Sequence, residues 1–139
     1  MSGFAVQELA YIKASPLVRV ATVGADYQPD LVVTGFDYDG TDFWIGGFEP
    51  TNTRRTRNLQ SGNNKVALLF DDILTESGWT PRYLRIYGSA ELVESPVGSG
   101  TLNMRITPLV SWSVNLTPES SGPAHALKPR KTLHKASRP

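Results

Sequence analysis

The most constraining feature of the sequence is the stretch from Tyr83 to Val93, in which two kinds of side chain strictly alternate. Successive side chains of a β-strand point to opposite faces of its sheet. The alternation therefore predicts a strand with one apolar face and one mixed face. The apolar set comprises Leu84, Ile86, Gly88, Ala90 and Leu92, and the other set comprises Arg85, Tyr87, Ser89 and Glu91.

Other segments have the β-branched and aromatic composition of strands. Asp39-Gly40 is typical of a tight hairpin, and most connections are too short for a parallel crossover. Because a closed antiparallel sheet leaves the fewest open edges, we predict a mainly β fold, an antiparallel barrel of about six strands. The expected strands are residues 17–23, 31–36, 43–45, 65–70, 83–93 and 104–114.

Two short helices complete the predicted fold. The first covers residues 4–14 and ends at Ser15-Pro16, because a residue before proline avoids the helical region. The second covers residues 51–61, with Thr51 or Asn52 as the N-cap and Gly62 as the stop.

Pro108 interrupts the last predicted strand and indicates an edge, a bulge or a bend. An uninterrupted alternation would place Val110 and Trp112 on the same face as Ile106. Their opposite face would carry Ser111 and Ser113. We therefore expect Trp112, like Trp44, to lie in the core.

Composition excludes several chemistries. The chain has 139 residues, no cysteine and two histidines, so we expect one domain without disulfides, thiolate nucleophiles or cysteine-bound metals. Both histidines lie near the C-terminus, which makes a Ser-His-Asp or two-histidine metal mechanism unexpected. We predict a barrel domain at 1–116 and a basic, flexible tail at 117–139, because the tail has few large apolar residues to bury.

The cellular location of the protein and its macromolecular partners are predicted from features that the sequence lacks. No basic leader or long apolar run is visible, so we expect a cytoplasmic protein that binds no membrane. No recognition helix or aromatic RNA-binding motif accompanies the basic residues, so we expect no nucleic-acid partner.

The stretch from Thr51 to Asn58 holds three arginines and three threonines, Thr51, Thr53, Arg54, Arg55, Thr56 and Arg57. Like charges at the start of a helix favour a nearby anion, and a phosphate fits guanidinium and hydroxyl groups together. At about 100° per residue the arginines fan around a helix and cannot all reach one phosphate. The alternative is a solvated basic face. The preceding Gly46-Gly47 pair, where backbone can approach a ligand closely, shifts the balance towards binding.

Two other groups admit two interpretations each. Asp71-Asp72 is better suited to pairing with Arg82 or Arg85 than to a shared cation site, since neighbours in a strand point to opposite faces. Trp79 lies in a loop with Arg82, where it would either stack on a planar ligand or plug a barrel end.

The order of several motifs resembles a known family. Ala21-Thr22-Val23-Gly24, Val33-Thr34-Gly35-Phe36, Ile45-Gly46-Gly47, Thr53-Arg54-Arg55-Thr56-Arg57-Asn58, Trp79-Thr80-Pro81-Arg82 and Met104-Arg105-Ile106-Thr107-Pro108 follow one another. In this order the chain, from about residue 4 to 116, is similar to the pyridoxamine 5′-phosphate oxidase-like split-barrel superfamily. More narrowly it resembles the branch of F420-dependent enzymes.

The resemblance implies a six-stranded split β-barrel, a homodimer, and a flavin-type cofactor at the subunit interface. It implies that Thr53, Arg54, Arg55 and Arg57 hold the cofactor phosphate, and that Trp79 and Arg82 come near the cofactor. Gly47, in the glycine pair before this segment, is a further candidate for cofactor binding. The ring system would lie against Ala21, Thr22, Val33, Thr34 and Gly35. The sequence departs from the family pattern at Arg55, where lysine is common, at Ser89, where a basic residue is common, and at Ser111-Trp112-Ser113.

A core without histidine or cysteine suits a reaction in which the cofactor carries the chemistry. The resemblance implies hydride transfer between F420 and a small unsaturated substrate, with no protein nucleophile. Nothing in the sequence chooses among Tyr83, Tyr87 and water as proton donor. The alternatives are an FMN-dependent oxidase or reductase, and a non-catalytic module that carries a flavin, a deazaflavin or another planar ligand such as haem.

Overall fold

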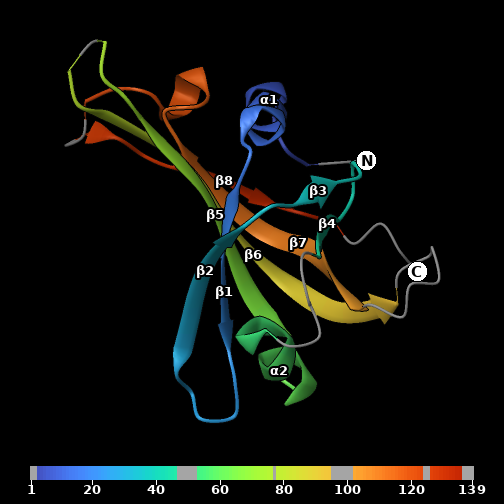
Figure 1. The fold of residues 1–139 in the computed structure, drawn as a ribbon. Coiled ribbons are helices and arrows are strands. Elements are labelled where there is room, and N and C mark those ends of the chain that lie inside the picture. Colours follow the sequence, from blue (N-terminus) through green and yellow to red (C-terminus); the bar gives the residue numbers. More distant parts are fainter. Residues whose placement is uncertain (1–2, 47–52, 77, 95–101, 124–125, 136–139) are drawn as a thin grey trace.

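The computed structural model describes residues 3–46, 53–76, 78–94, 102–123 and 126–135. Over these residues, eight strands form one antiparallel sheet that curls into a half-barrel (Figure 1). The strand order is β2-β1-β5-β6-β7-β4-β3, and β8 pairs with β7. The predicted mainly β split-barrel fold is confirmed.

The elements follow the predicted pattern with two additions. The strands are β1 Val18–Val23, β2 Pro29–Thr34, β3 Asp37–Tyr38, β4 Phe43–Ile45, β5 Lys65–Leu74, β6 Thr80–Glu94, β7 Leu102–Val114 and β8 Arg130–Leu133. The helices are α1 Val6–Ala14, α2 Arg54–Gln60 and the short 3-10 helix η2 Pro118–Ser120. The predicted six strands therefore missed β3, which has two residues, and β8.

The interior of the half-barrel is apolar and rich in aromatic rings. The alternation in β6 places Leu84 and Ile86 in the core, as predicted. Phe43 lies at the centre of the aromatic group, with ring centroids 4.5 Å from Tyr38 and 5.9 Å from Phe70. The helix α1 closes one opening of the half-barrel through Tyr11 and Ile12, which are buried.

A β-bulge reverses the faces of β7 after Pro108. Gly88 pairs with Pro108, but Tyr87 pairs with Val110, so Leu109 is an extra residue. One extra residue moves every later side chain to the other face of the sheet. Ser111 and Ser113 are consequently buried, and the prediction that Trp112 lies in the core is wrong. The indole lies on the outer face instead, against Tyr87 and Arg85. Trp44 is also outside the core, because it is half-buried and its indole N–H donates to Asp39.

The described part of residues 117–135, which the sequence analysis expects to be a flexible tail, packs on the barrel. The Arg130 guanidinium donates to the fully buried carboxylate of Glu8 in α1 at 2.7 Å. His134 bonds Ser111 at 2.8 Å and packs on the Phe4 ring. Backbone pairing with β7 and these polar contacts order the segment, although it contains few large apolar residues.

Candidate functional site

The helix α2 begins later than predicted, and its N-cap is Thr53. The Thr53 hydroxyl accepts a hydrogen bond from the Thr56 backbone N–H at 3.3 Å. Thr51, Asn52 and Gly47 lie outside the described residues. Gly62 follows the helix with a φ of +105°, a left-handed conformation that suits glycine after a helix end, so its predicted role as a stop is confirmed.

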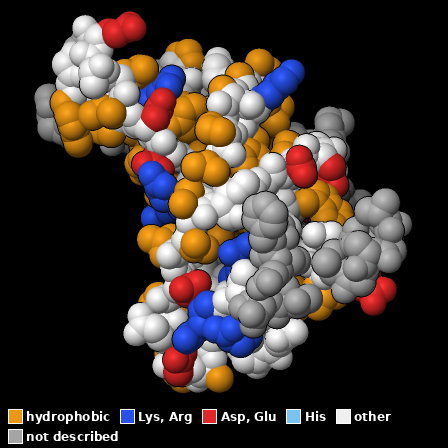
Figure 2. All heavy atoms as spheres, in the orientation of Figure 1, with side chains coloured by type: hydrophobic (Ala, Val, Ile, Leu, Met, Phe, Trp, Pro, Cys, Tyr) orange, Lys and Arg blue, Asp and Glu red, His pale blue; other side chains and the backbone are white. Residues whose placement is uncertain are grey.

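The three arginines of α2 point in different directions, as the helical spacing predicts. Arg54 donates to both carboxylate oxygens of Asp26 at 2.9 and 3.0 Å. Arg57 is exposed. Arg55 is buried, with 9% of its surface exposed, and donates to the backbone carbonyl of Gly46 at 3.2 Å. Basic side chains gather around α2 in Figure 2, with acidic side chains beside them.

Arg55 differs from Arg54 because no carboxylate contacts it among the described residues. Burial lowers the pKa of its guanidinium, and the charge of Asp30 acts in the opposite direction. A buried cation without a contacting anion is unfavourable, so an anionic ligand would stabilise it. The guanidinium of Arg55 has five N–H donors, and the bond to the Gly46 carbonyl leaves most of them available for such a ligand.

Asn58 anchors α2 to the sheet, a role that the sequence analysis missed. Its side-chain amide donates to the Thr22 hydroxyl at 2.9 Å in a buried contact, and its carbonyl accepts from Arg54 at 3.2 Å. A Cβ atom at Gly24 would lie 2.3 Å from the Asn58 carbonyl oxygen. Gly24 therefore permits the close approach of α2 to β1.

The backbone segments predicted to lie under a ring system are on the neighbouring strands β1 and β2. Ala21 and Val33 project from the outer face, and Val33 is 46% exposed. Thr34 is half-buried, and Gly35 follows β2 with an exposed surface. The side chain of Thr22 points inward and is taken by Asn58, so only its backbone is available on the outer face.

A shallow groove of about 450 Å³ lies on this outer face, next to the end of the sheet that carries α2. Its lining is mainly apolar, and it crosses β1, β5, β6 and β7. The lining residues are Ala21, Thr22, Val23, Pro29, Lys65, Val66, Ala67, Tyr87, Gly88, Leu109 and Val110. A planar apolar body fits such a floor. The helix α2, which carries the buried Arg55, supplies none of the lining residues and packs on the inner side of β1 through Asn58 and Thr22.

Trp79 and Arg82 lie elsewhere in the chain. Trp79 is 76% exposed beside the tip of the β5–β6 hairpin, which extends past α1 at the end of the sheet opposite α2 (Figure 1). A single chain therefore does not bring either residue to α2.

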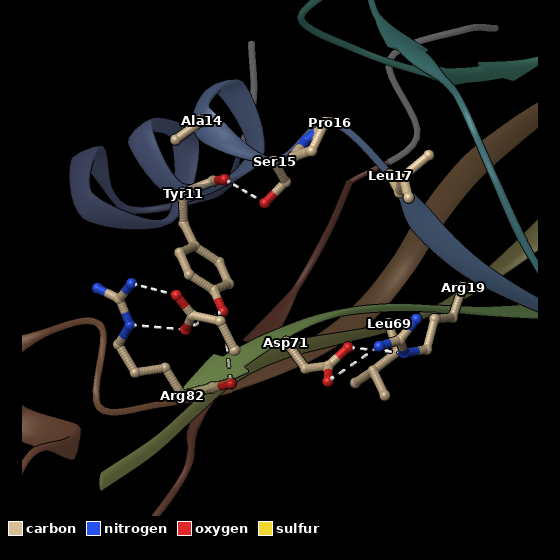
Figure 3. Close-up of a pocket in the computed structure, with 10 residues that line it drawn as sticks. Tyr11, Ala14, Ser15, Pro16, Leu17, Arg19, Leu69, Asp71 and Arg82 are labelled. Atoms are coloured by element: carbon tan, nitrogen blue, oxygen red, sulfur yellow. Dashed lines mark hydrogen bonds and ion pairs between the residues drawn. The ribbon is translucent and has the colours of Figure 1, made fainter. Parts of the chain in front are cut away.

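Arg82 belongs to a network that closes a second cavity, of about 300 Å³, between α1 and the sheet (Figure 3). Its guanidinium binds both carboxylate oxygens of Asp72, and the Tyr11 hydroxyl donates to the same carboxylate at 2.8 Å. Hydrogen bonds from Arg82 hold the pKa of Asp72 below its usual range. Burial and the Asp72 contact raise the pKa of Tyr11. Arg19 and Asp71 form a second ion pair across this cavity.

Asp71 and Asp72 thus have separate arginine partners, which agrees with the ion-pairing interpretation of this pair. Asp72 pairs with Arg82, as the sequence analysis suggested, and Asp71 pairs with Arg19. Within the described ranges, no helix has the length and apolar character that crossing a membrane requires.

Comparisons with known proteins agree with this architecture. The sequence model of the pyridoxamine 5′-phosphate oxidase family matches residues 5–128. A 5a,11a-dehydrotetracycline/5a,11a-dehydrooxytetracycline reductase of Streptomyces rimosus subsp. rimosus is 33% identical over 91 residues. This stretch is 63% of the chain and 63% of the relative, so the chain spans less than two thirds of the length of that curated protein.

Solved structures support the fold. A conserved hypothetical protein from Mycobacterium tuberculosis superposes with a TM-score of 0.64 at 22% identity, over 88% of this chain and 95% of that one. An F420 reductase superposes with a TM-score of 0.59 at 18% identity, over 73% of this chain and 93% of that one.

Proposed function

Because the chain belongs to the pyridoxamine 5′-phosphate oxidase family, we propose that it is an oxidoreductase that uses the deazaflavin F420. In this proposal, hydride passes between the cofactor and a small unsaturated substrate. The reductase name of the Streptomyces relative and the F420 reductase among the structural neighbours support the choice of reaction and cofactor.

The observation that carries the proposal is Arg55, a buried arginine that contacts no carboxylate among the described residues, on the helix at the end of the sheet where an apolar groove crosses the outer face. A cofactor with a phosphate and a planar ring system matches both features. Arg55 would hold the phosphate, with Arg57 and Thr53 beside it. Arg54, which forms an ion pair with Asp26, would hold the β1–β2 turn against the helix.

When bound, the cofactor supplies the hydride. The groove floor of Ala21, Ala67 and Val110 would hold the ring against strand backbone and keep water from that face. No described side chain is needed as a nucleophile. Tyr87, which lines the groove and is 46% exposed, is a proton donor within this proposal, whereas Tyr83 does not line the groove.

We further propose that two chains pair with the cofactor between them. Leu31, Val32 and Val33 expose an apolar surface along β2, and Trp79 projects from the far end of the sheet. A second chain would bring Trp79 and Arg82 to an α2 cluster that their own chain does not reach. Light scattering after size exclusion measures the mass, and a monomer at micromolar concentration would contradict this part.

Fluorescence titration with F420 and, in parallel, with FMN tests which cofactor the protein binds. We expect F420 to bind more tightly, and Arg55→Ala to weaken binding about ten- to hundredfold through loss of a charge-assisted contact. Lys13→Ala, at the opposite end of the molecule, is the control for the loss of one positive charge.

Tighter binding of FMN would make the protein an FMN-dependent member of the family. Binding of neither cofactor by the wild-type chain would contradict the proposal. Turnover with a reducible acceptor separates an enzyme from a module that only carries the cofactor.

A further inference from the structure

Two neighbouring rows of side chains cross the outer face of the sheet from β2 to β8. The strand register aligns one row that contains no charged side chain. This row comprises Leu31, Ala21, Ala67, Tyr87, Val110 and Leu133. The next row is Val33, Arg19, Leu69, Arg85, Trp112 and Lys131. The apolar row supplies the floor of the groove, so the second row borders it at about 7 Å, the spacing of two residues along a strand.

Arg85 stands on this border and has no acidic partner among the described residues. Its guanidinium carbon lies 4.3 Å from the centre of the Trp112 ring and 5.3 Å from that of Tyr87. Its Nε atom is buried and has no hydrogen-bond partner among the described residues. The aromatic rings hold the guanidinium by its plane and leave its terminal N–H groups available.

Other outer-face arginines are neutralised within the chain. Arg19, in the same row, pairs with Asp71 at 2.9 Å. Arg105 also lies over a tryptophan ring, Trp44 at 5.7 Å, but it pairs with Glu91. Arg85 therefore differs from Arg105 in lacking a carboxylate partner in the described part of the chain, although both contact an indole.

Lys131 adds a second positive charge at the same ring. Its ammonium lies 5.9 Å from the centre of the Trp112 ring, and no ion pair forms there among the residues described. The lysine reaches this position only because β8 pairs with β7 and aligns Lys131 with Trp112. The C-terminal strand thus contributes directly to the border of the groove.

We propose that Arg85 and Lys131, with the rings of Tyr87 and Trp112, bind the anionic group of a planar ligand whose ring body lies along this border of the groove, beside the floor that would hold the cofactor ring. The aromatic rings of the border select a flat, apolar body, and the two cations select a carboxylate, sulfonate or ionised enol. The inference rests on the proposed oxidoreductase function only in naming this ligand as the substrate. It narrows the substrate class to planar organic anions.

Two fluorescent probes with the same ring system test this site without any cofactor. Anilinonaphthalene sulfonate carries a negative charge, whereas N-phenylnaphthylamine is neutral. We expect wild type to bind the anionic probe more tightly, and Arg85→Met with Lys131→Met to weaken it about tenfold, since methionine keeps much of the apolar stem and removes the charge. Affinity for the neutral probe should change less than about twofold.

Arg105→Met is the matched control, because it removes an indole-stacked arginine that already has a carboxylate partner. It should leave the affinity for both probes unchanged. Equal loss of both probes in the double variant, no loss of either, or no binding by wild type would overturn the proposal.

A change in mass by light scattering in the double variant, with unchanged probe binding, would assign the two cations to a subunit contact and also overturn it. Because the probes need no cofactor, these outcomes are independent of the F420 and FMN titrations. Failure of the proposed function and failure of this site are therefore distinguishable.

Discussion

The two ends of the sheet use the same residue types in opposite ways. At the α1 end, Arg82 and Arg130 contact the carboxylates of Asp72 and Glu8. The Glu8 pair joins α1 to β8, and the Tyr11 hydroxyl joins α1 to the Asp72 carboxylate. At the α2 end, Arg55 is buried against a backbone carbonyl and contacts no carboxylate among the described residues. The difference indicates which arginines stabilise the fold and which one is available to a ligand.

Arg130→Met should give the largest effect, because it leaves the carboxylate of Glu8 buried without its partner. We expect the free energy of unfolding to fall by about 3 kcal/mol, the usual consequence of breaking a buried pair. Urea denaturation measures the loss, and Glu8→Gln in the same chain should restore most of it. Lys131→Met, on the opposite face of β8, is the control and should leave the stability nearly unchanged.

Gly24→Ala sharpens the comparison at the α2 end, where Asn58 of the helix packs against Gly24 and donates to Thr22. The new Cβ would lie 2.3 Å from the Asn58 carbonyl oxygen, so we expect a loss of about 2 kcal/mol. Combining it with Asn58→Ala removes the clash. If Gly24→Ala costs as much with Asn58→Ala as it does alone, the contact does not fix the position of α2.

A direct test substitutes Arg82 and Arg55 separately. Arg82→Met should lower stability by up to about 1 kcal/mol, because its pair with Asp72 is partly exposed. Arg55→Met should leave the stability of the ligand-free chain within about 0.5 kcal/mol of wild type, since it removes a desolvated charge and a single hydrogen bond. Thermal melts in the absence of ligand measure both, and the reverse order would break the comparison.

The smallest effect is a pH dependence at the α1 end. Burial lowers the pKa of His134 from its usual 6.5, so the unfolded chain binds its proton more readily than the folded chain. Stability contributed by the neutral ring is present above about pH 6.5 and declines as the pH falls towards the folded pKa. Urea midpoints between pH 7.5 and 5 measure this slope, which His134→Gln should reduce. An identical slope in that variant would show that His134 is not responsible.

Much of the barrel could be predicted from the sequence because alternation reports directly which face of a strand is buried. The alternation of β6 holds along the strand, whereas that of β7 reverses at Pro108. A proline signals an irregularity but not whether it inserts a residue, and one inserted residue decides where Trp112 points. The strand β8 escaped prediction because its order depends on Glu8, more than a hundred residues away.

The candidate site was predictable in part for the same reason. Helical spacing predicted that Arg54, Arg55 and Arg57 point in different directions. Which of them pairs with a carboxylate depends on the position of the β1–β2 turn, which carries Asp26. The role of Asn58 had a weak signal, its position four residues after Arg54 on one helix face. Trp79 and Arg82 follow α2 in sequence, and only the fold shows that the long β5–β6 hairpin carries them to the opposite end.

The central claim, that Arg55 holds a phosphate, is tested most directly by measuring what the phosphate contributes to binding. FMN and riboflavin differ only by that phosphate group. F420 and its deazaflavin core differ by the phosphate and the tail that the phosphate carries. The account predicts that wild type favours FMN over riboflavin by at least about tenfold, and that Arg55→Ala brings this ratio close to one. A ratio that is the same in both proteins would contradict the account, because the phosphate would then be held elsewhere.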